Sequence, residues 1–143
     1  MREKTFFMVK PDGIARGLTK TILSRITQAG LLIAQQNELK LDPALAAELY
    51  SPHLGQSFYP GLLKFITSGP VLACQLEGEE AIARVRALMG ATDPREAKPG
   101  TIRGDLKEEN IFTVDKSIKN LVHGSDSPES AARELAIFFK GGI

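Results

Sequence analysis

The chain has 143 residues, 43% of them hydrophobic, which is typical of one compact domain with a substantial core. Its 18 Lys and Arg residues nearly balance its 17 Asp and Glu residues, so there is no strong field to attract nucleic acid or an anionic membrane. We therefore predict a single domain over residues 1–143, with no membrane partner and no specific nucleic-acid partner. An anionic ligand would have to be bound by a few local groups.

The single cysteine and the absence of long apolar segments bear on the cellular compartment of the protein. Cys74 lies in an apolar run, which indicates a small buried thiol and not a nucleophile or metal ligand. One cysteine cannot form an internal disulfide, which suits a reducing environment. No segment resembles a signal peptide or is long enough to cross a bilayer. The sequence thus predicts a cytoplasmic protein.

The first third of the chain alternates strand and helix signals. Residues 5–9 are β-prone and are followed by the turn former 10–13, so Lys10 should lie at the end of a buried strand. Residues 18–29 carry apolar side chains at helical spacing and stop at Gly30. Residues 31–41 follow as a second strand.

The middle of the chain predicts three helices and a strand. Asp42 is an N-cap followed by Pro43, which opens a helix that ends near Pro52. A short helix over 58–67, a strand over 71–76 that ends at 77–78 and an amphipathic helix over 79–89 come next.

The last third contains a long loop, and loops of this length in compact domains usually serve a function. Residues 90–119 are rich in Gly, Pro and charge, with at most a short strand at 111–114. A brief strand at 120–122 precedes a helix that Ser127 caps and that runs to about Phe139. This order of elements predicts an α+β fold, an antiparallel or mixed sheet covered by helices. Four strands with one helical layer would correspond to a ferredoxin-like arrangement.

The two histidines have different surroundings. His53 follows Pro52 at a helix end and is predicted to be a solvated loop residue. His123 lies between a short apolar run and a Gly-Ser-Asp-Ser segment, where composition alone favours a structural histidine.

The final predicted helix offers a possible carboxylate partner for His123. One stripe of that helix combines apolar side chains with a carboxylate, namely Ala131, Glu134, Leu135 and Phe138. A buried carboxylate needs a partner to offset its desolvation, and His123 is a candidate. Such a pair would fix the imidazole tautomer and leave the other ring nitrogen free to attack an electrophile. The alternative is a surface-edge Glu134 paired with Arg133 or Lys140, and periodicity does not decide between the two.

Cationic side chains that could bind an anionic electrophile occur in several places. Arg86 lies at the edge of its helix's apolar stripe and can reach over the core, whereas Arg84 lies on the opposite side and is predicted to be solvated. Arg103 follows a glycine and a threonine in the long loop and offers a bidentate fork for phosphate oxygens. Lys10 adds a point charge. The chain has no Walker-type loop, no G-x-G-x-x-G and no Cys/His set for zinc.

Six motif-like segments occur in chain order: 10–13 (KPDG), 58–62 (FYPGL), 67–71 (TSGPV), 90–94 (GATDP), 99–105 (PGTIRGD) and 123–127 (HGSDS). In residues and order they resemble the motifs of the nucleoside diphosphate kinases, and the resemblance covers essentially the whole chain. The blocks at 99–105 and 123–127 are the most specific.

This resemblance implies a ferredoxin-like α/β sandwich with a four-stranded antiparallel sheet. It implies transfer of the γ-phosphoryl group of a nucleoside triphosphate, typically ATP, to a nucleoside diphosphate by a ping-pong mechanism. His123 would become phosphorylated and Glu134 would orient it, while Mg²⁺ would bridge the nucleotide phosphates mostly through water. The family also implies a homo-oligomer, a tetramer or hexamer built from dimers.

The resemblance assigns further roles residue by residue. Lys10, Arg86, Thr92 and Arg103 would bind phosphates, with Lys10 also reaching the ribose beside Asn120. Phe58 would stack on the base, which would explain tolerance for different bases. By the same matching, Tyr50 would lie beside the histidine, and Leu62 would pack near the base.

The segment over residues 106–119 departs from the family because it is several residues longer than expected. We interpret it as an extension beside the nucleotide pocket or at a subunit contact. A relative that binds nucleotides without turnover would be expected to lack the histidine, the carboxylate or the arginines, and all are present here. A nucleic-acid-binding module is disfavoured by the net charge of +1 and the absence of Trp.

Overall fold

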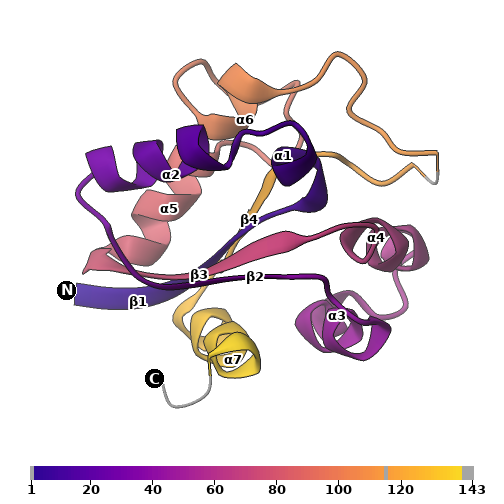
Figure 1. Cartoon of the computed structure of the whole chain (residues 1–143), viewed down its shortest axis with the longest axis horizontal. Helices are drawn as coiled ribbons and strands as arrows, with labels where there is room; N and C mark the ends of the chain where they lie inside the picture. The colour runs from indigo at the N-terminus through magenta and orange to yellow at the C-terminus, as the bar shows by residue number, and fades with distance from the viewer. Residues whose placement is uncertain (1, 115, 140–143) are drawn as a thin grey trace.

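A four-stranded antiparallel sheet lies at the centre of the computed structural model, which describes residues 2–114 and 116–139 (Figure 1). Its strands are β1 (Arg2–Val9), β2 (Leu32–Leu39), β3 (Val71–Glu79) and β4 (Val122–Gly124), in the order β2-β3-β1-β4. The first strand is therefore central, and β4 forms an edge that pairs with it through Met8 opposite His123. The predicted α+β class with an antiparallel sheet is confirmed.

Helices cover both faces of this sheet (Figure 1). They are α1 (Pro11–Ala15), α2 (Thr19–Gln28), α3 (Pro43–Leu49), α4 (Tyr59–Ile66), α5 (Ala81–Met89), α6 (Ile102–Leu106) and α7 (Pro128–Phe138), with a 3-10 turn η1 (Ser51–His53) after α3. One core cluster joins α2, α5 and α6 to one face, and the other joins α3, α4 and α7 to the opposite face.

The sequence left the number of helical layers open, and strand β1 explains why helices cover both faces of the sheet. Because side chains alternate along a strand, Phe7 and Val9 pack into one cluster while Phe6 and Met8 pack into the other. All four are 0% exposed. A central strand that is apolar on both faces requires cover on both.

The caps predicted for two helices are present. Asp42 accepts a hydrogen bond from the Leu45 amide at 2.7 Å and starts α3. Ser127 accepts one from the Ser130 amide at 3.1 Å and starts α7. A proline occupies the first turn of each helix, where its missing N–H costs nothing.

Two short helices and one strand extension differ from the sequence predictions. The predicted turn at 10–13 is the start of α1, with Pro11 in its first turn. The predicted loop contains α6, whose N-cap Thr101 accepts from the Gly104 amide at 3.0 Å. Strand β3 continues to Glu79 beyond its predicted end.

The long segment after α6 folds back on itself near its middle. The short strand predicted at 111–114 is a single bridge between Phe112 and Ile118. The Thr113 amide donates to the Ser117 carbonyl at 2.9 Å, and the Lys119 amide donates to the Ile111 carbonyl at 2.6 Å. We call residues 111–114 and 116–119 the 111–119 hairpin.

Cys74 lies buried in strand β3, as predicted, and burial raises the pKa of its thiol to about 12. Within the described parts of the chain, no helix combines the length and the apolar character needed to cross a membrane.

Candidate active site

His123 occupies the middle of the short edge strand β4, where close packing fixes its backbone. The next residue, Gly124, lies so near α5 that an added Cβ would be 2.9 Å from the Met89 side chain and 3.2 Å from that of Val85. On the preceding residue, the Val122 carbonyl accepts a 2.7 Å hydrogen bond from Arg103. His123 is therefore presented from a strand that can move little.

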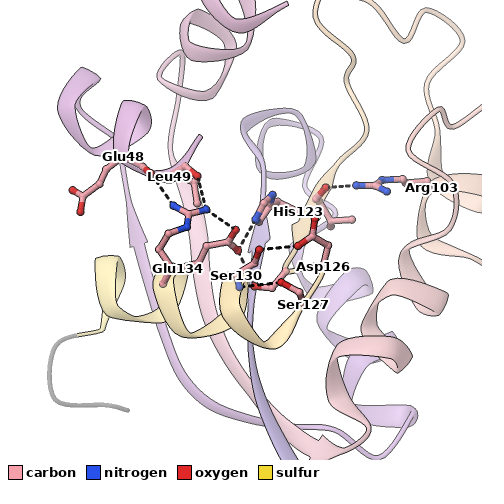
Figure 2. A network of polar contacts seen from close by, with 11 residues as sticks. Glu48, Leu49, Arg103, His123, Asp126, Ser127, Ser130 and Glu134 are labelled. Carbon is pink, nitrogen blue, oxygen red and sulfur yellow. Dashed lines mark hydrogen bonds and ion pairs between the residues drawn. The ribbon is translucent and has the colours of Figure 1, made fainter. Parts of the chain in front are cut away.

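Glu134 on α7 lies directly beside His123 (Figure 2). Its side chain is buried although it is ionisable, and its Oε1 is 2.9 Å from Nε2 of His123. Oε1 also accepts a 2.7 Å hydrogen bond from the buried hydroxyl of Ser125. An ionised carboxylate can only accept, so Nε2 carries the proton and Nδ1 keeps its lone pair.

Both pairings considered for Glu134 from the sequence occur together. While Oε1 faces His123, Oε2 lies 3.4 Å from the guanidinium of Arg133. The other candidate, Lys140, lies outside the described residues. The burial of Glu134 rules out the surface-edge position of the alternative, although its second oxygen does face Arg133.

Aromatic rings pack around the imidazole. Tyr50 meets His123 edge-on, with ring centroids 5.7 Å apart and an interplanar angle of 90°. Phe6 of strand β1 is 5.8 Å away in a tilted arrangement. Burial raises the pKa of Tyr50, and the Glu134 charge adds to this shift, so its hydroxyl stays protonated.

Lys10, at the end of β1, begins a chain of polar contacts along the site. Its Nζ donates to Asn120 Oδ1 at 2.7 Å, and the Asn120 amide donates to the Thr92 carbonyl at 3.0 Å. Burial is the main reason that the pKa of Lys10 is lowered to about 8; the charge of Asp12 opposes this shift and that of Arg103 adds to it. An anionic ligand would therefore find an ammonium group that is buried and that, among residues 2–114 and 116–139, forms no ion pair with a carboxylate.

The backbone between Asn120 and His123 is strained at Leu121. This residue has φ of 73°, which is unfavourable for a branched side chain. Its amide donates to Asp12 Oδ2 at 3.0 Å, and its carbonyl accepts from the Lys10 amide at 2.8 Å. Burial raises the pKa of Asp12, whose buried Oδ1 has no hydrogen-bond partner among the residues that the structure describes. Helix α1 and its N-cap residue Lys10 thus hold the strained turn through both its amide and its carbonyl.

Arg103 on α6 joins three backbone segments. It donates to the carbonyls of Gly90, Asn120 and Val122 at 3.1, 3.0 and 2.7 Å. Its side chain is buried, and burial lowers its pKa to about 10, with the charge of Arg86 as the second cause. The remaining N–H groups of this rigid fork are available to an anion.

These groups line one cavity of about 590 Å³. The structure brings all ten sequence-predicted site residues into its walls: Lys10, Tyr50, Phe58, Leu62, Arg86, Thr92, Arg103, Asn120, His123 and Glu134. The lining combines cations and the histidine with the apolar side chains of Phe58 and Leu62. The arrangement suits a ligand with an anionic end and a flat apolar end.

Several wall residues were missed by sequence reasoning. His53 was predicted to be solvated; it is exposed but also lines the cavity, with its ring 5.5 Å from that of Phe58. Arg133 and Asp126 line the wall near Glu134. No local pattern identifies these residues, because their roles depend on how η1 and α7 meet in space.

The 111–119 hairpin forms a further part of the wall. Phe112, Lys116, Ser117 and Ile118 all line the cavity. The guanidinium of Arg95 lies 5.3 Å from the centre of the Phe112 ring, an arrangement typical of cation–π contact. The extension lies beside the cavity and carries an aromatic ring there.

The prediction that Arg84 is solvated was wrong. Its guanidinium donates to the Glu79 carbonyl at 3.0 Å and to the Ala29 carbonyl at the end of α2. An arginine side chain is long enough to reach the end of a neighbouring helix.

Within residues 2–114 and 116–139, no group of three or more His, Cys, Asp or Glu side chains is placed to hold a metal ion. The cavity walls carry mainly cations and neutral donors. A divalent ion in this cavity would have to be held mostly by the ligand and water.

The sequence and fold match known proteins over nearly their full length. The family model described as "Nucleoside diphosphate kinase" matches residues 3–142. A nucleoside diphosphate kinase of Mycolicibacterium vanbaalenii is 52% identical over 142 residues, which cover 99% of each chain. Its relatives under that name are phosphotransferases.

Two solved structures agree with this match. A halophilic nucleoside diphosphate kinase from Halobacterium salinarum in complex with CDP has a TM-score of 0.89 and 44% identity, covering 98% of this chain and 89% of that one. A transition state mimic of the enzyme from Borrelia burgdorferi, with bound vanadate and ADP, has a TM-score of 0.91 and 37% identity, covering 98% and 88%. This chain therefore belongs to the nucleoside diphosphate kinase family.

Proposed function

We propose that this chain transfers the γ-phosphoryl group of a nucleoside triphosphate to a nucleoside diphosphate with His123 as the phosphoryl carrier. The observation that carries the proposal is the contact between Nε2 of His123 and the buried Glu134 carboxylate. It leaves the Nδ1 lone pair as the nucleophile, in a cavity whose described lining includes five lysine and arginine side chains.

The first half-reaction follows from this arrangement. The Nδ1 lone pair forms a bond to the γ-phosphorus while the bond to the bridging oxygen breaks, and the electron pair leaves with the nucleoside diphosphate. The Nε2 proton stays on the ring, where Glu134 balances the positive charge that develops. The second half-reaction is the reverse with another diphosphate, so the mechanism is ping-pong.

We assign phosphate binding to Lys10, Arg86, Thr92 and Arg103. The buried Lys10 and Arg103 support this role because they form no carboxylate ion pair among the described residues, and their main contacts are amide and carbonyl oxygens. Cations placed before the substrate arrives need no reorganisation as charge develops on the phosphoryl oxygens.

We assign nucleoside binding to apolar side chains that line the same cavity. Phe58 is half exposed and offers its face to a base, and Leu62 lies one helical turn further along α4. We assign a ribose hydroxyl to Lys10 and Asn120 together, and the hydrogen bond between the two side chains supports this assignment. Stacking suits every base, so we expect broad base tolerance.

Mg²⁺ is the cofactor that this chemistry requires, because it neutralises charge on the transferring phosphates. The chain's own residues fit a nucleotide-held ion, since the described part of the cavity offers cations and single carboxylates but no cluster of ligands. We also propose, from the family resemblance, a tetramer or hexamer of dimers and a cytoplasmic location.

The test is phosphoryl labelling without an acceptor. With γ-labelled ATP and Mg²⁺, the protein should acquire a stoichiometric, acid-labile label that GDP discharges. His123→Ala should take up no label and lose turnover, whereas His53→Ala should still be labelled because Nδ1 of His123 remains. Equal labelling of His123→Ala and the parent would refute the proposal.

A further inference from the structure

Arg133 precedes Glu134 on α7, but its side chain extends to a different helix. Its NH1 donates to the Glu48 carbonyl at 2.9 Å, and its NH2 donates to the Leu49 carbonyl at 3.2 Å. The same NH2 lies 3.4 Å from Glu134 Oε2. In Figure 2, dashed lines from the labelled Glu48, Leu49 and Glu134 meet at this one guanidinium group.

The two carbonyls to which Arg133 donates lie at the C-terminal end of α3. The last carbonyls of a helix have no partner within the helix, and a cation there also interacts favourably with the helix dipole. The next residue after Leu49 is Tyr50, whose ring meets His123 edge-on, and η1 with His53 follows. Arg133 therefore fixes the point where the aromatic wall of the cavity begins.

The contacts of Glu134 are divided between its two oxygens. Oε1 accepts hydrogen bonds from His123 and Ser125, and Oε2 accepts one from Arg133. If Oε2 lost its partner, the carboxylate could rotate about its terminal bond, which has a broad, roughly two-fold torsional preference. The contact at Oε2 thus adds a constraint on the carboxylate plane to the two hydrogen bonds at Oε1.

We propose that Arg133 is a positioning residue for phosphoryl transfer: it holds the Glu134 carboxylate in register with His123 and ties both to the wall formed by Tyr50. This inference rests on the function proposed above. It requires no contact between Arg133 and the nucleotide. Its effect should appear in the step where Nδ1 bonds to phosphorus and the ring acquires charge.

Substitution of Arg133 tests the proposal through the separation of kcat from KM. Arg133→Gln should lower kcat about ten- to a hundredfold, the usual effect of losing a group that orients a reacting side chain, with KM for ATP and GDP nearly unchanged. Arg133→Lys keeps a cation but loses the planar fork, so it should recover part of the loss.

Arg84→Gln is the matched control. Arg84 also extends from one helix to a carbonyl at the end of another, Ala29 at the C-terminus of α2, but it is not among the residues that line the cavity. Both Gln variants should lower Tm to a similar extent, and only Arg133→Gln should lower kcat. An equal kcat loss in Arg84→Gln would assign the effect to general stability and overturn the proposal.

A second readout examines the histidine without any substrate. In the ligand-free parent, ¹⁵N NMR should show His123 protonated at Nε2, and Arg133→Gln should shift the ring towards a mixture of tautomers. A raised KM with unchanged kcat, or an unchanged tautomer and kcat, would overturn the proposal. If the parent itself takes up no label, the proposed function fails, and the NMR comparison still tests the Arg133 geometry independently.

Discussion

At the scale of single residues, the burial of Lys10 has a direct consequence for binding. Lysine is rarely buried without a carboxylate partner, and here its closest acceptor is the neutral Asn120. Burial lowers the pKa of Lys10 to about 8, so the charged form dominates below that pH and is lost as the pH rises through it. A phosphate group favours the charged form.

We therefore expect ADP affinity to fall above pH 8, by up to about tenfold per pH unit, with proton uptake on binding. Calorimetric titrations between pH 7 and 9 in buffers of different ionisation enthalpy measure both. In Lys10→Arg the guanidinium stays charged across this range, so the steep fall should disappear. The same slope in both proteins would mean that another group causes it.

Only some of the side-chain contacts in the site could be predicted from the sequence. The stripe that carries Glu134 follows from helical periodicity, because position on a helix fixes which face a side chain occupies. The partners of Asp12, Leu121 and Arg133 could not be read, since they join segments more than 80 residues apart in the chain. Such contacts depend on the tertiary arrangement.

At the scale of elements, α6 presents Arg103 and depends on a glycine. An added Cβ at Gly104 would lie 2.1 Å from the Lys98 carbonyl oxygen and 2.7 Å from Thr101 Oγ1. Both are rigid neighbours, one of them backbone. The start of α6 can accept no side chain at this position without moving.

Gly104→Ala should therefore destabilise the fold by several kcal/mol and lower turnover through displacement of Arg103. Gly69→Ala is the control, because its Cβ would meet only Pro11 at an ordinary 3.7 Å. Urea unfolding and steady-state kinetics of both variants provide the comparison. A Gly104→Ala protein as stable and active as Gly69→Ala would show that α6 tolerates the shift.

The 111–119 hairpin allows a second test at this scale. Phe112 lines the cavity, whereas Val114 at the tip is 100% exposed. If the ring contributes to nucleoside binding, Phe112→Ala should raise nucleotide KM about fivefold, with little change in kcat. This corresponds to a loss of roughly 1 kcal/mol of binding free energy, the low end for loss of base stacking. Val114→Ala should have no effect on KM. An unchanged KM in Phe112→Ala together with an altered oligomer in size-exclusion chromatography would favour the subunit-contact interpretation instead.

The elements that sequence reasoning missed share a physical cause. Helix α6 has five residues, including Gly104 and Asp105, whose intrinsic helix propensity is low. It forms because Thr101 caps it and because Arg103 is anchored to three carbonyls. Longer helices such as α2 and α7 were predicted from periodicity because their amphipathic faces are long enough to show the period.

At the scale of the whole molecule, the cavity joins the two hydrophobic clusters. Arg86 and Arg103 belong to helices packed on one face of the sheet, and Tyr50, Phe58 and Glu134 come from segments on the other. A nucleotide bound here would contact both. It would therefore favour the fully assembled state over any state in which one layer has separated.

Nucleotide should stabilise the protein by mass action, by about 2.7 kcal/mol when its free concentration is 100 times Kd. The measurement is Tm by calorimetry with increasing Mg-ADP. His123→Ala should retain this stabilisation, because the histidine reacts with the phosphoryl group but the phosphate-binding cations remain. Absence of any Tm increase in the parent would contradict nucleotide binding in this cavity.

The position of β4 beside β1 bears on how the molecule acquires its activity. The strand that carries His123 pairs with the first strand of the sheet, so the reactive group and Lys10 become neighbours only when segments some 110 residues apart have met. Contacts of such long range form late because loop closure must precede them. During refolding, competence to accept a phosphoryl group should therefore appear with the slowest kinetic phase, after most helical signal has returned. The site would then serve as a natural reporter of completed folding.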